Sequence, residues 1–264
     1  MTAPAISAAA PAPAPTPSLP ATTWLSIFLR LLAIQGAWNY ETMLGNGVGF
    51  CVEPALRLLP GGQDGPAYRA ALARQSQYFN AHPYMAAVAV GALARAELQG
   101  EDAAKIERFR TALCGPLGSV GDRLVWATWL PACSIVALAA FGFGVGTAGV
   151  LLVFLGIYNA GHLALRAWGL SAGLDHGMRV ASALGGPVLR RGPTHIAQAA
   201  ALIGGIALPL ALDQVIGPGR ALFGIVLGAV ALGGFVLARL HGRAEGWKIA
   251  VVLLVLFVLY AVVR

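Results

Sequence analysis

The sequence predicts an all-α integral membrane protein, with short amphipathic or re-entrant helices in its N-terminal half and about five membrane-spanning helices in its C-terminal half. Of its 264 residues, 58% are hydrophobic and only 11% are charged, and the mean hydropathy of +0.72 is typical of a chain that lies in a bilayer. Five apolar runs approach the roughly 20 residues that a helix needs to cross the hydrocarbon. They are 124–143, 147–168, 196–216, 221–238 and 247–263.

Lys and Arg residues are distributed unevenly around these runs. Five lie in the segment 95–123, three lie between the second and third runs, three lie in 239–248, and none lies in the loop 144–146. By the positive-inside rule, the basic loops are cytoplasmic and the C-terminus is outside. This topology accounts for the net charge of +7. Since no nucleic-acid-binding motif accompanies the basic residues, we expect no nucleic-acid partner.

The N-terminal half divides into a tail and several short helices. Residues 1–23 are rich in Ala and Pro and carry no charged side chain, which predicts a disordered tail before a membrane domain at 24–264. We expect the short helices to be interfacial or re-entrant and packed on a partner, because a lone half-span leaves backbone groups unpaired in lipid. They are an amphipathic helix at 24–44, a helix from Asp64-Gly65-Pro66 that weakens near His82, a helix from Pro83 to about Gly100, and a helix at 101–113.

Three polar and aromatic strings interrupt this apolar chain. They are Gln-Gly-Ala-Trp-Asn-Tyr-Glu at Gln35–Glu41, Tyr-Phe-Asn-Ala-His-Pro-Tyr at Tyr78–Tyr84, and Gly-Pro-Leu-Gly-Ser-Val-Gly-Asp at Gly115–Asp122. Polar groups are costly in a membrane and usually functional. Amides, carboxylates and rings together suit a polyhydroxylated ligand, because hydrogen bonds hold the hydroxyls while rings cover C–H faces. The candidate substrate- or partner-binding residues are Gln35, Trp38, Asn39, Glu41, Asn80, His82 and Asp122.

The first string is expected on the helix at 24–44. Helical spacing places Gln35, Asn39 and Thr42 on one face, while Glu41 projects roughly 120° away from Gln35. One ligand therefore need not touch both groups. The alternative is structural: Asn39 and Glu41 cap or tie neighbouring helices.

The second and third strings are expected at breaks between helices. His82 precedes a proline, which disfavours helical geometry, and broken membrane helices expose backbone groups that transporters use at binding sites. The alternative is a turn in which His82 satisfies a stray carbonyl. The glycines of Gly115–Asp122 predict a flexible or tightly turned connector, in which Asp122 either caps the next helix or lines a pathway.

Other signals are weaker. Gly144–Gly149 matches the dinucleotide pattern Gly-x-Gly-x-x-Gly, but it lies between two apolar runs with no strand before it, so we interpret it as a tight turn. The three cysteines are scattered and His82 has no second ligand at i+4, so we expect no metal site and no cofactor. Arg166, four residues after His162, is expected to snorkel to the cytoplasmic edge of the membrane.

In this order, the three strings resemble subunit IID of the mannose/fructose/sorbose family of bacterial sugar phosphotransferase systems. The family pattern runs approximately Gln-x-Ser-Trp-Asn-Tyr-Glu-Arg-Met-Gln, then Phe-Phe-Asn-Thr-His-Pro-Tyr, then Gly-Pro-Leu-Ala-Gly-Ile-Gly-Asp-Ser. The matching stretches here are Gln35–Met43, Tyr78–Tyr84 and Gly115–Asp122. Thr42 and Leu44 replace a usual Arg and Gln, Arg123 replaces a Ser, and Leu130 replaces an Arg.

The resemblance implies a multi-pass subunit of the bacterial inner membrane that forms a hetero-oligomer with subunit IIC and works with cytoplasmic IIA and IIB subunits. A hexose-type sugar would cross through the membrane pair and be phosphorylated by IIB, so this chain would not be an enzyme by itself and would have no catalytic residue. The candidate residues would lie near the sugar path or the IIC contact. Two alternatives stay open: a transport-incompetent scaffold or regulator, suggested by the replaced polar residues, and a membrane enzyme that uses His82 and Asp122.

Overall fold

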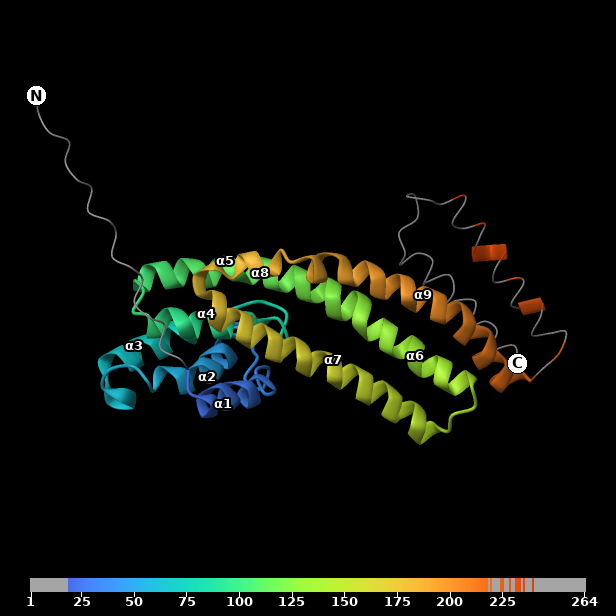
Figure 1. Cartoon of the computed structure of the whole chain (residues 1–264), viewed down its shortest axis with the longest axis horizontal. Coiled ribbons are helices and arrows are strands. Elements are labelled where there is room, and N and C mark those ends of the chain that lie inside the picture. The colour runs from blue at the N-terminus through green and yellow to red at the C-terminus, as the bar shows by residue number, and fades with distance from the viewer. Residues whose placement is uncertain are drawn as a thin grey trace, which may run out of the picture.

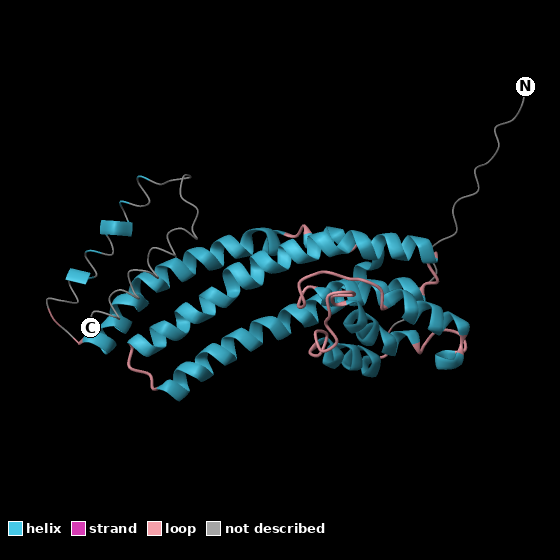
Figure 2. Cartoon of the chain, turned by 180° about the vertical axis from the view of Figure 1, so that it is seen from behind, coloured by secondary structure: helices cyan, strands magenta, loops and turns pink. Residues whose placement is uncertain are grey.

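The computed structural model describes residues 19–217 and a few separate residues between 219 and 239, and this part of the chain is helical (Figure 1). Helices α1–α4 form a compact head, and the helices from α5 onward form a long arm that extends away from it. Most of the loops lie in the head (Figure 2). The elements are α1 (Ala21–Leu31), α2 (Gly45–Leu56), η1 (Gly62–Asp64), α3 (Pro66–Gln75), α4 (Ala86–Leu98), α5 (Ala103–Gly121), η2 (Asp122–Trp129), α6 (Leu130–Gly142), α7 (Thr147–His176), η3 (Gly177–Arg179), α8 (Ala181–Leu184) and α9 (Pro187–Ile216).

The arm contains three helical stretches long and apolar enough to cross a membrane, judged by length and composition: Ala103–Gly142, Thr147–Arg179 and Ala181–Ile216. They confirm the first three predicted runs; the runs 221–238 and 247–263 lie outside the described residues. Helix α6 packs against both α7 and α9. At 1.5 Å per residue, the first stretch is about 60 Å long, twice the hydrocarbon thickness of roughly 30 Å. Its charged beginning therefore extends beyond the apolar layer.

The two ends of the arm differ in charge. The beginning of α5, the end of α7 and the beginning of α9 lie beside the head, whereas the turn between α6 and α7 and the end of α9 lie at the far end (Figure 1). Of the segments rich in Lys and Arg, 95–123 and 179–191 lie in the described part of the chain and are therefore at the head end, and the uncharged turn 143–146 is at the other. This separation agrees with the alternation that the positive-inside rule requires.

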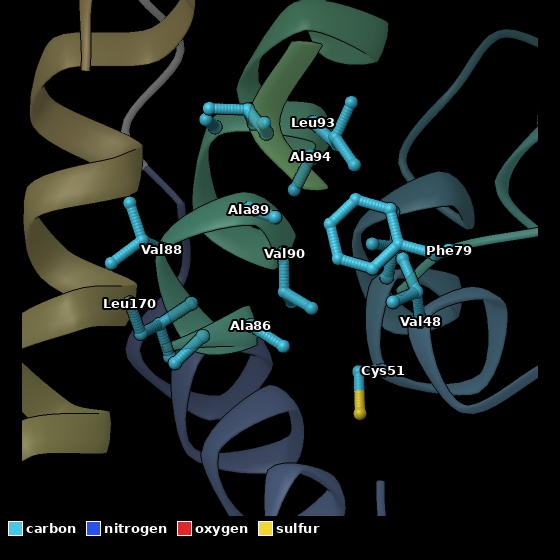
Figure 3. Close-up of a cluster of buried hydrophobic side chains, with 14 of the residues drawn as sticks. Val48, Cys51, Phe79, Ala86, Val88, Ala89, Val90, Leu93, Ala94 and Leu170 are labelled. Carbon is cyan, nitrogen blue, oxygen red and sulfur yellow. The ribbon is translucent and has the colours of Figure 1, made fainter. Parts of the chain in front are cut away.

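Helix α4 forms the centre of the head, and every residue from Ala86 to Ala94 is buried. Its apolar side chains pack against α2, α7 and the ring of Phe79 (Figure 3). Helices α4 and α7 approach so closely that a Cβ on Gly91 would lie 2.3 Å from the carbonyl oxygen of Leu170, and one on Gly173 would lie 2.3 Å from that of Val88. The helix expected to need a partner is thus covered by its own chain.

Two predicted elements were wrong in extent. The expected helix at 24–44 ends at Leu31 and is followed by tight turns as far as Leu44. After Leu31 the backbone N–H groups of Leu32, Ala33 and Ile34 bond to carbonyls three residues back, as in turns. Further on, the Asn39 side chain accepts the N–H groups of Glu41 and Thr42, which a helix would use internally, so the helix does not resume. At its other end, α1 begins at Ala21, inside the stretch expected to be a tail, of which residues 1–18 lie outside the described part.

The connector expected at Gly115–Asp122 is helical instead. Helix α5 continues through Pro116 and the glycines to Gly121, and η2 and α6 follow without a break. Leu113, Leu117 and Gly121, four residues apart, are buried. This packing outweighs the weak helix propensity of the local sequence.

Candidate functional site

A groove of about 460 Å³ lies where the loop before α4 meets the end of α5. The structure brings the second and third strings together here, although thirty residues separate them in the sequence. Asn80, His82 and Asp122, three of the predicted candidates, all line the groove. The complete lining is Tyr78, Asn80, Ala81, His82, Pro83, Cys114, Gly115, Gly118, Ser119 and Asp122.

His82 forms the buried side of the groove and is only 2% exposed. Its Nδ1 accepts a hydrogen bond from the backbone N–H of Tyr84 (3.2 Å), which leaves the proton of the neutral ring on Nε2. The ring packs against Trp126 and Tyr84, with centroid separations of 4.9 and 5.1 Å. Nε2 is buried and has no hydrogen-bond partner among the described residues, which is uncommon for a buried donor.

Burial lowers the pKa of His82 from its ordinary 6.5 to about 4. The negative charge of Asp122 opposes this shift, and the positive charge of Arg166 reinforces it. The ring is therefore neutral near pH 7 and offers one N–H donor, not a positive charge. The sequence-based alternative, in which His82 satisfies a stray carbonyl, is wrong, because its one hydrogen bond goes to a backbone N–H.

Gly121 allows His82 to occupy this position. A Cβ at residue 121 would lie 2.2 Å from the Cβ and 2.4 Å from the Cγ of His82, distances that real side chains do not reach. The glycine is thus a contact surface for the imidazole ring, not the flexible joint that the sequence suggested.

Asn80 and Asp122 lie on the open side of the groove. Both are exposed, and neither side chain makes a hydrogen bond within the described residues. Asp122 was expected either to cap a helix or to line a pathway. It does not cap a helix, because α5 and η2 are continuous across it. The π-helical geometry of η2 is a form often found at functional sites.

The first string forms a loop, so the predicted helical face of Gln35, Asn39 and Thr42 was wrong. Instead, Asn39 Oδ1 accepts hydrogen bonds from the backbone N–H groups of Glu41 and Thr42, both 2.9 Å, and its Nδ2 donates to the Thr42 hydroxyl (2.8 Å). The alternative of a local structural role thus describes Asn39 well. Gln35, Trp38 and Glu41 are exposed and lie outside the groove lining.

The backbone of the first string nevertheless supports the groove. The N–H of Phe79 donates to the Thr42 carbonyl (3.1 Å), and the N–H of Leu44 donates to the Phe79 carbonyl (2.9 Å). Met43, between these bonds, has a φ of +53°, a left-handed conformation that is strained for a residue with a side chain. The two strings therefore fix each other next to the groove.

Arg110, which is not among the predicted candidates, binds the loop that contains Phe79 from the side of α5. It is 4% exposed, and its guanidinium donates to the carbonyls of Gln75, Gln77 and Tyr78. These bonds satisfy carbonyls at and just after the C-terminal end of α3. They explain why α3 ends at Gln75, whereas the sequence predicted an end near His82. The only sequence signal was a basic residue five residues before the third string.

Arg166 does not snorkel to the membrane edge. It is 4% exposed, donates to the carbonyl of Leu31 at the end of α1, and lies over the ring of Tyr84, 4.5 Å from the ring centroid. A helix C-terminus and a ring face both attract a cation, so together they hold the guanidinium inside the protein.

Tyr84 follows the groove residue Pro83 and contacts a second set of polar groups, which lies on α7. Its hydroxyl is hydrogen-bonded to that of Tyr158 (2.7 Å), and its ring stacks on His162 at a centroid separation of 5.0 Å. His162 Nε2 lies 2.9 Å from Asn159 Oδ1. No group of three His, Cys, Asp or Glu residues able to hold a metal ion occurs in the part of the chain that the structure describes.

The sequence pattern of the PTS system mannose/fructose/sorbose family IID component matches residues 18–264, nearly the whole chain. The chain belongs to this family. The resemblance noted from the three strings is thereby confirmed, and the chain is a IID component of a phosphotransferase-system permease family.

Curated relatives carry the same family name. The mannose-specific EIID component of Escherichia coli (strain K12) is 33% identical over 174 residues, and the sorbose-specific EIID component of Klebsiella pneumoniae is 35% identical over 178 residues. These matches cover 62% and 63% of this chain, and 59% and 61% of the respective relatives. The alignments thus span about three fifths of the length of the relatives.

A solved structure has the same overall fold. It is entitled "CryoEM Structure of Mannose Transporter ManYZ and Microcin E492 (MceA) complex", and one of its chains matches with a TM-score of 0.52 at 25% sequence identity. The match covers 92% of this chain and 97% of that one. Together with the three apolar stretches, it shows that this IID component is a membrane protein.

Proposed function

We propose that this IID component forms, with a subunit IIC, the sugar pathway of a mannose-type phosphotransferase permease in the bacterial inner membrane. Cytoplasmic IIA and IIB subunits supply the phosphoryl group, and this chain is a non-catalytic subunit of a hetero-oligomer. The observation that carries the proposal is the groove in which Asn80, His82 and Asp122 meet.

The chemistry of the groove suits a hexose. Asn80 both donates and accepts hydrogen bonds, Asp122 accepts them, and the Nε2–H of His82 donates one. Sugar hydroxyls pair with all three kinds of group. Tyr78 and Pro83 add apolar surface for the C–H faces of the ring, and a groove of about 460 Å³ is large enough for one hexose.

The exposed residues of the first string fit a contact with the partner subunit. Trp38 is 45% exposed and packs edge-to-face against Tyr40, which is 85% exposed, with centroids 4.8 Å apart. Exposed aromatic pairs are enriched at protein interfaces. We assign Gln35, Trp38 and Glu41 to the IIC contact, and Asn39 to shaping the loop that presents them.

The test is sugar-dependent consumption of phosphoenolpyruvate by membrane vesicles that contain this chain and its partner subunits. Asn80→Ala should lower uptake of labelled hexose about tenfold, because one lost hydrogen bond is worth about 1–1.5 kcal/mol. Gln77→Ala is the matched control, since Gln77 is an exposed amide on the same loop that does not line the groove. Equal uptake by vesicles lacking the chain would reject the proposal.

One observation favours a second function. Arg123 places a positive charge next to Asp122, and Leu44, where the family pattern has a polar residue, is buried at 3% exposure. A chain that keeps the fold but binds no sugar would act as a scaffold or regulator of the phosphotransferase system. In that case the vesicles would contain the assembled complex yet show no uptake, and Asn80→Ala would change nothing.

A further inference from the structure

A second cavity, of about 580 Å³, lies between α7, η2 and the beginning of α9. It shares no lining residue with the groove. Its walls are almost entirely apolar, and its polar side chains are those of Tyr84 and His162, with the indoles of Trp129 and Trp168. The aliphatic wall consists of Leu124, Val125, Leu165, Val188, Leu189 and Ile196. With so few hydrogen-bonding groups, the cavity suits a hydrocarbon chain better than a sugar.

The cavity is at the basic end of the arm. Its α9 wall begins at Pro187, the first residue of the helix, and reaches Ile196 about 14 Å further along at 1.5 Å per residue. The beginning of α9 lies beside the head, as do the beginning of α5 and the end of α7, which belong to or adjoin the described segments rich in Lys and Arg (Figure 1). The mouth of the cavity is therefore at one membrane surface, and its apolar wall extends into the hydrocarbon.

Positive charge lies next to this mouth. Arg191 is three residues after Val188 and four before His195, so these side chains share one flank of α9, beside the wall formed by Val188, Gly192 and Ile196. Residues 177–212 contain three arginines and neither Asp nor Glu. None of the ion pairs found among the described residues involves these arginines.

From this arrangement we propose that the cavity binds an anionic phospholipid of the bilayer. One acyl chain occupies the apolar cavity, and the phosphate group is held by Arg191 at its mouth. The acyl chain and the phosphate group thus each meet a complementary surface, apolar and basic respectively, within one or two turns of α9. Basic residues next to an intramembrane pocket on the positively charged side are the arrangement by which anionic headgroups are bound.

Trp168 makes the proposal measurable, because it lines the cavity and is 38% exposed. The full chain is reconstituted in phosphatidylcholine vesicles containing a minor fraction of brominated phosphatidylglycerol, whose bromine atoms quench nearby indoles. The signal is the quenching of the wild type minus that of Trp168→Phe. One arginine at the surface enriches an anionic lipid about fivefold over its bulk fraction, so quenching should exceed that of equally dilute brominated phosphatidylcholine by about this factor.

Two variants separate the charge from the cavity. Arg191→Gln should reduce quenching by brominated phosphatidylglycerol to the level seen with brominated phosphatidylcholine, whereas Arg108→Gln, an exposed arginine on α5 that lines neither cavity, should not. Ala164→Phe, one turn before Trp168 in the cavity wall, should reduce quenching by both lipids. Equal quenching of the wild type by the two lipids would overturn the proposal. So would loss of Trp168-dependent quenching when the partner subunit is present, since a protein segment would then fill the cavity.

Discussion

Replacing Gly121 by alanine should disturb the groove through a single methyl group. The new Cβ would lie 2.2 Å from the Cβ of His82, more than 1 Å inside the closest ordinary contact of about 3.4 Å. Neither group can rotate away, because both positions are set by backbone. His82 and the beginning of α4 must therefore move away from η2. Overpacking of this kind costs about 1–3 kcal/mol.

Gly118→Ala is the matched control for this experiment. Gly118 lies on the same helix and lines the same groove, but a Cβ there would meet nothing within 4 Å. Both variants gain the same helix propensity, up to about 1 kcal/mol. The difference between their melting temperatures therefore isolates the clash with His82. It should be about 2–12 °C, since 1 kcal/mol shifts the melting temperature of a chain of this size by about 2–4 °C.

The assay is thermal unfolding of the purified chain, followed by hexose uptake in vesicles. We expect Gly118→Ala to melt at or above the wild-type temperature, and Gly121→Ala to melt well below Gly118→Ala and to lose uptake. If the two variants melt together, the packing of His82 against residue 121 does not determine the shape of the groove. The reasoning would then be refuted.

Three further outcomes are expected. Glu97 is 6% exposed and accepts hydrogen bonds from Arg74 (3.0 and 2.7 Å) and Gln75 (2.7 Å), so Glu97→Gln should lower the free energy of unfolding by about 3 kcal/mol. The control is Glu101→Gln, which removes an exposed ion pair and should lower it by less than about 0.5 kcal/mol; thermal unfolding measures both. Although burial raises the pKa of Glu53, hydrogen bonds from its neighbours lower it from 4.5 to about 2. The ionised carboxylate therefore stabilises the folded chain above pH 4.5, and this stabilisation is lost as the pH falls toward 2. Glu53→Gln should remove this loss of stability in acid-unfolding curves. His82 stays neutral down to about pH 4, whereas in the unfolded chain it takes up a proton near 6.5, so stability should fall as the pH drops from 6.5 to 4; His82→Gln should flatten that part of the curve, and an unchanged slope would contradict the burial of the ring.

The sequence predicted the apolar helices well because their signal is local. Twenty consecutive apolar residues are costly to place anywhere but in a membrane or a core, whatever the rest of the chain does. The same signal is ambiguous for α4, whose apolar residues are as continuous but are buried against α2 and α7 in place of a partner protein. Length alone separated the two outcomes: α4 has 13 residues, too few to span.

Prediction failed where tertiary contacts outweigh local preference. The glycines of the third string indicated a joint, yet burial of Leu113 and Leu117 keeps the backbone helical. The first string had helical spacing, yet Asn39 accepts the backbone hydrogen bonds locally and Phe79 pairs with the loop. The pairing of Phe79 with Thr42 and Leu44 joins segments more than thirty residues apart, so no local window contains it.

For the site, the sequence selected candidate residues by their chemistry but could not predict which of them lie together. Asn80, His82 and Asp122 meet in the groove, while Gln35, Trp38 and Glu41 do not line it. Arg110 was missed because its role depends on three backbone carbonyls that come within reach only after folding. Because every residue has a backbone carbonyl, the sequence does not indicate which of them will accept a side-chain hydrogen bond.

The enclosure of α4 has a consequence for synthesis of the chain. Its closest partner surface, around Leu170 and Gly173 on α7, is translated about 70 residues after α4 is complete. At about 5–20 residues per second, the ribosome needs about 4–14 s to supply it. During that interval a helix whose first nine residues are all apolar, and which is too short to cross the bilayer, lacks its cover. Folding of the head can thus be completed only after α7 has been synthesised, and until then α4 must be shielded by the insertion machinery or by a chaperone.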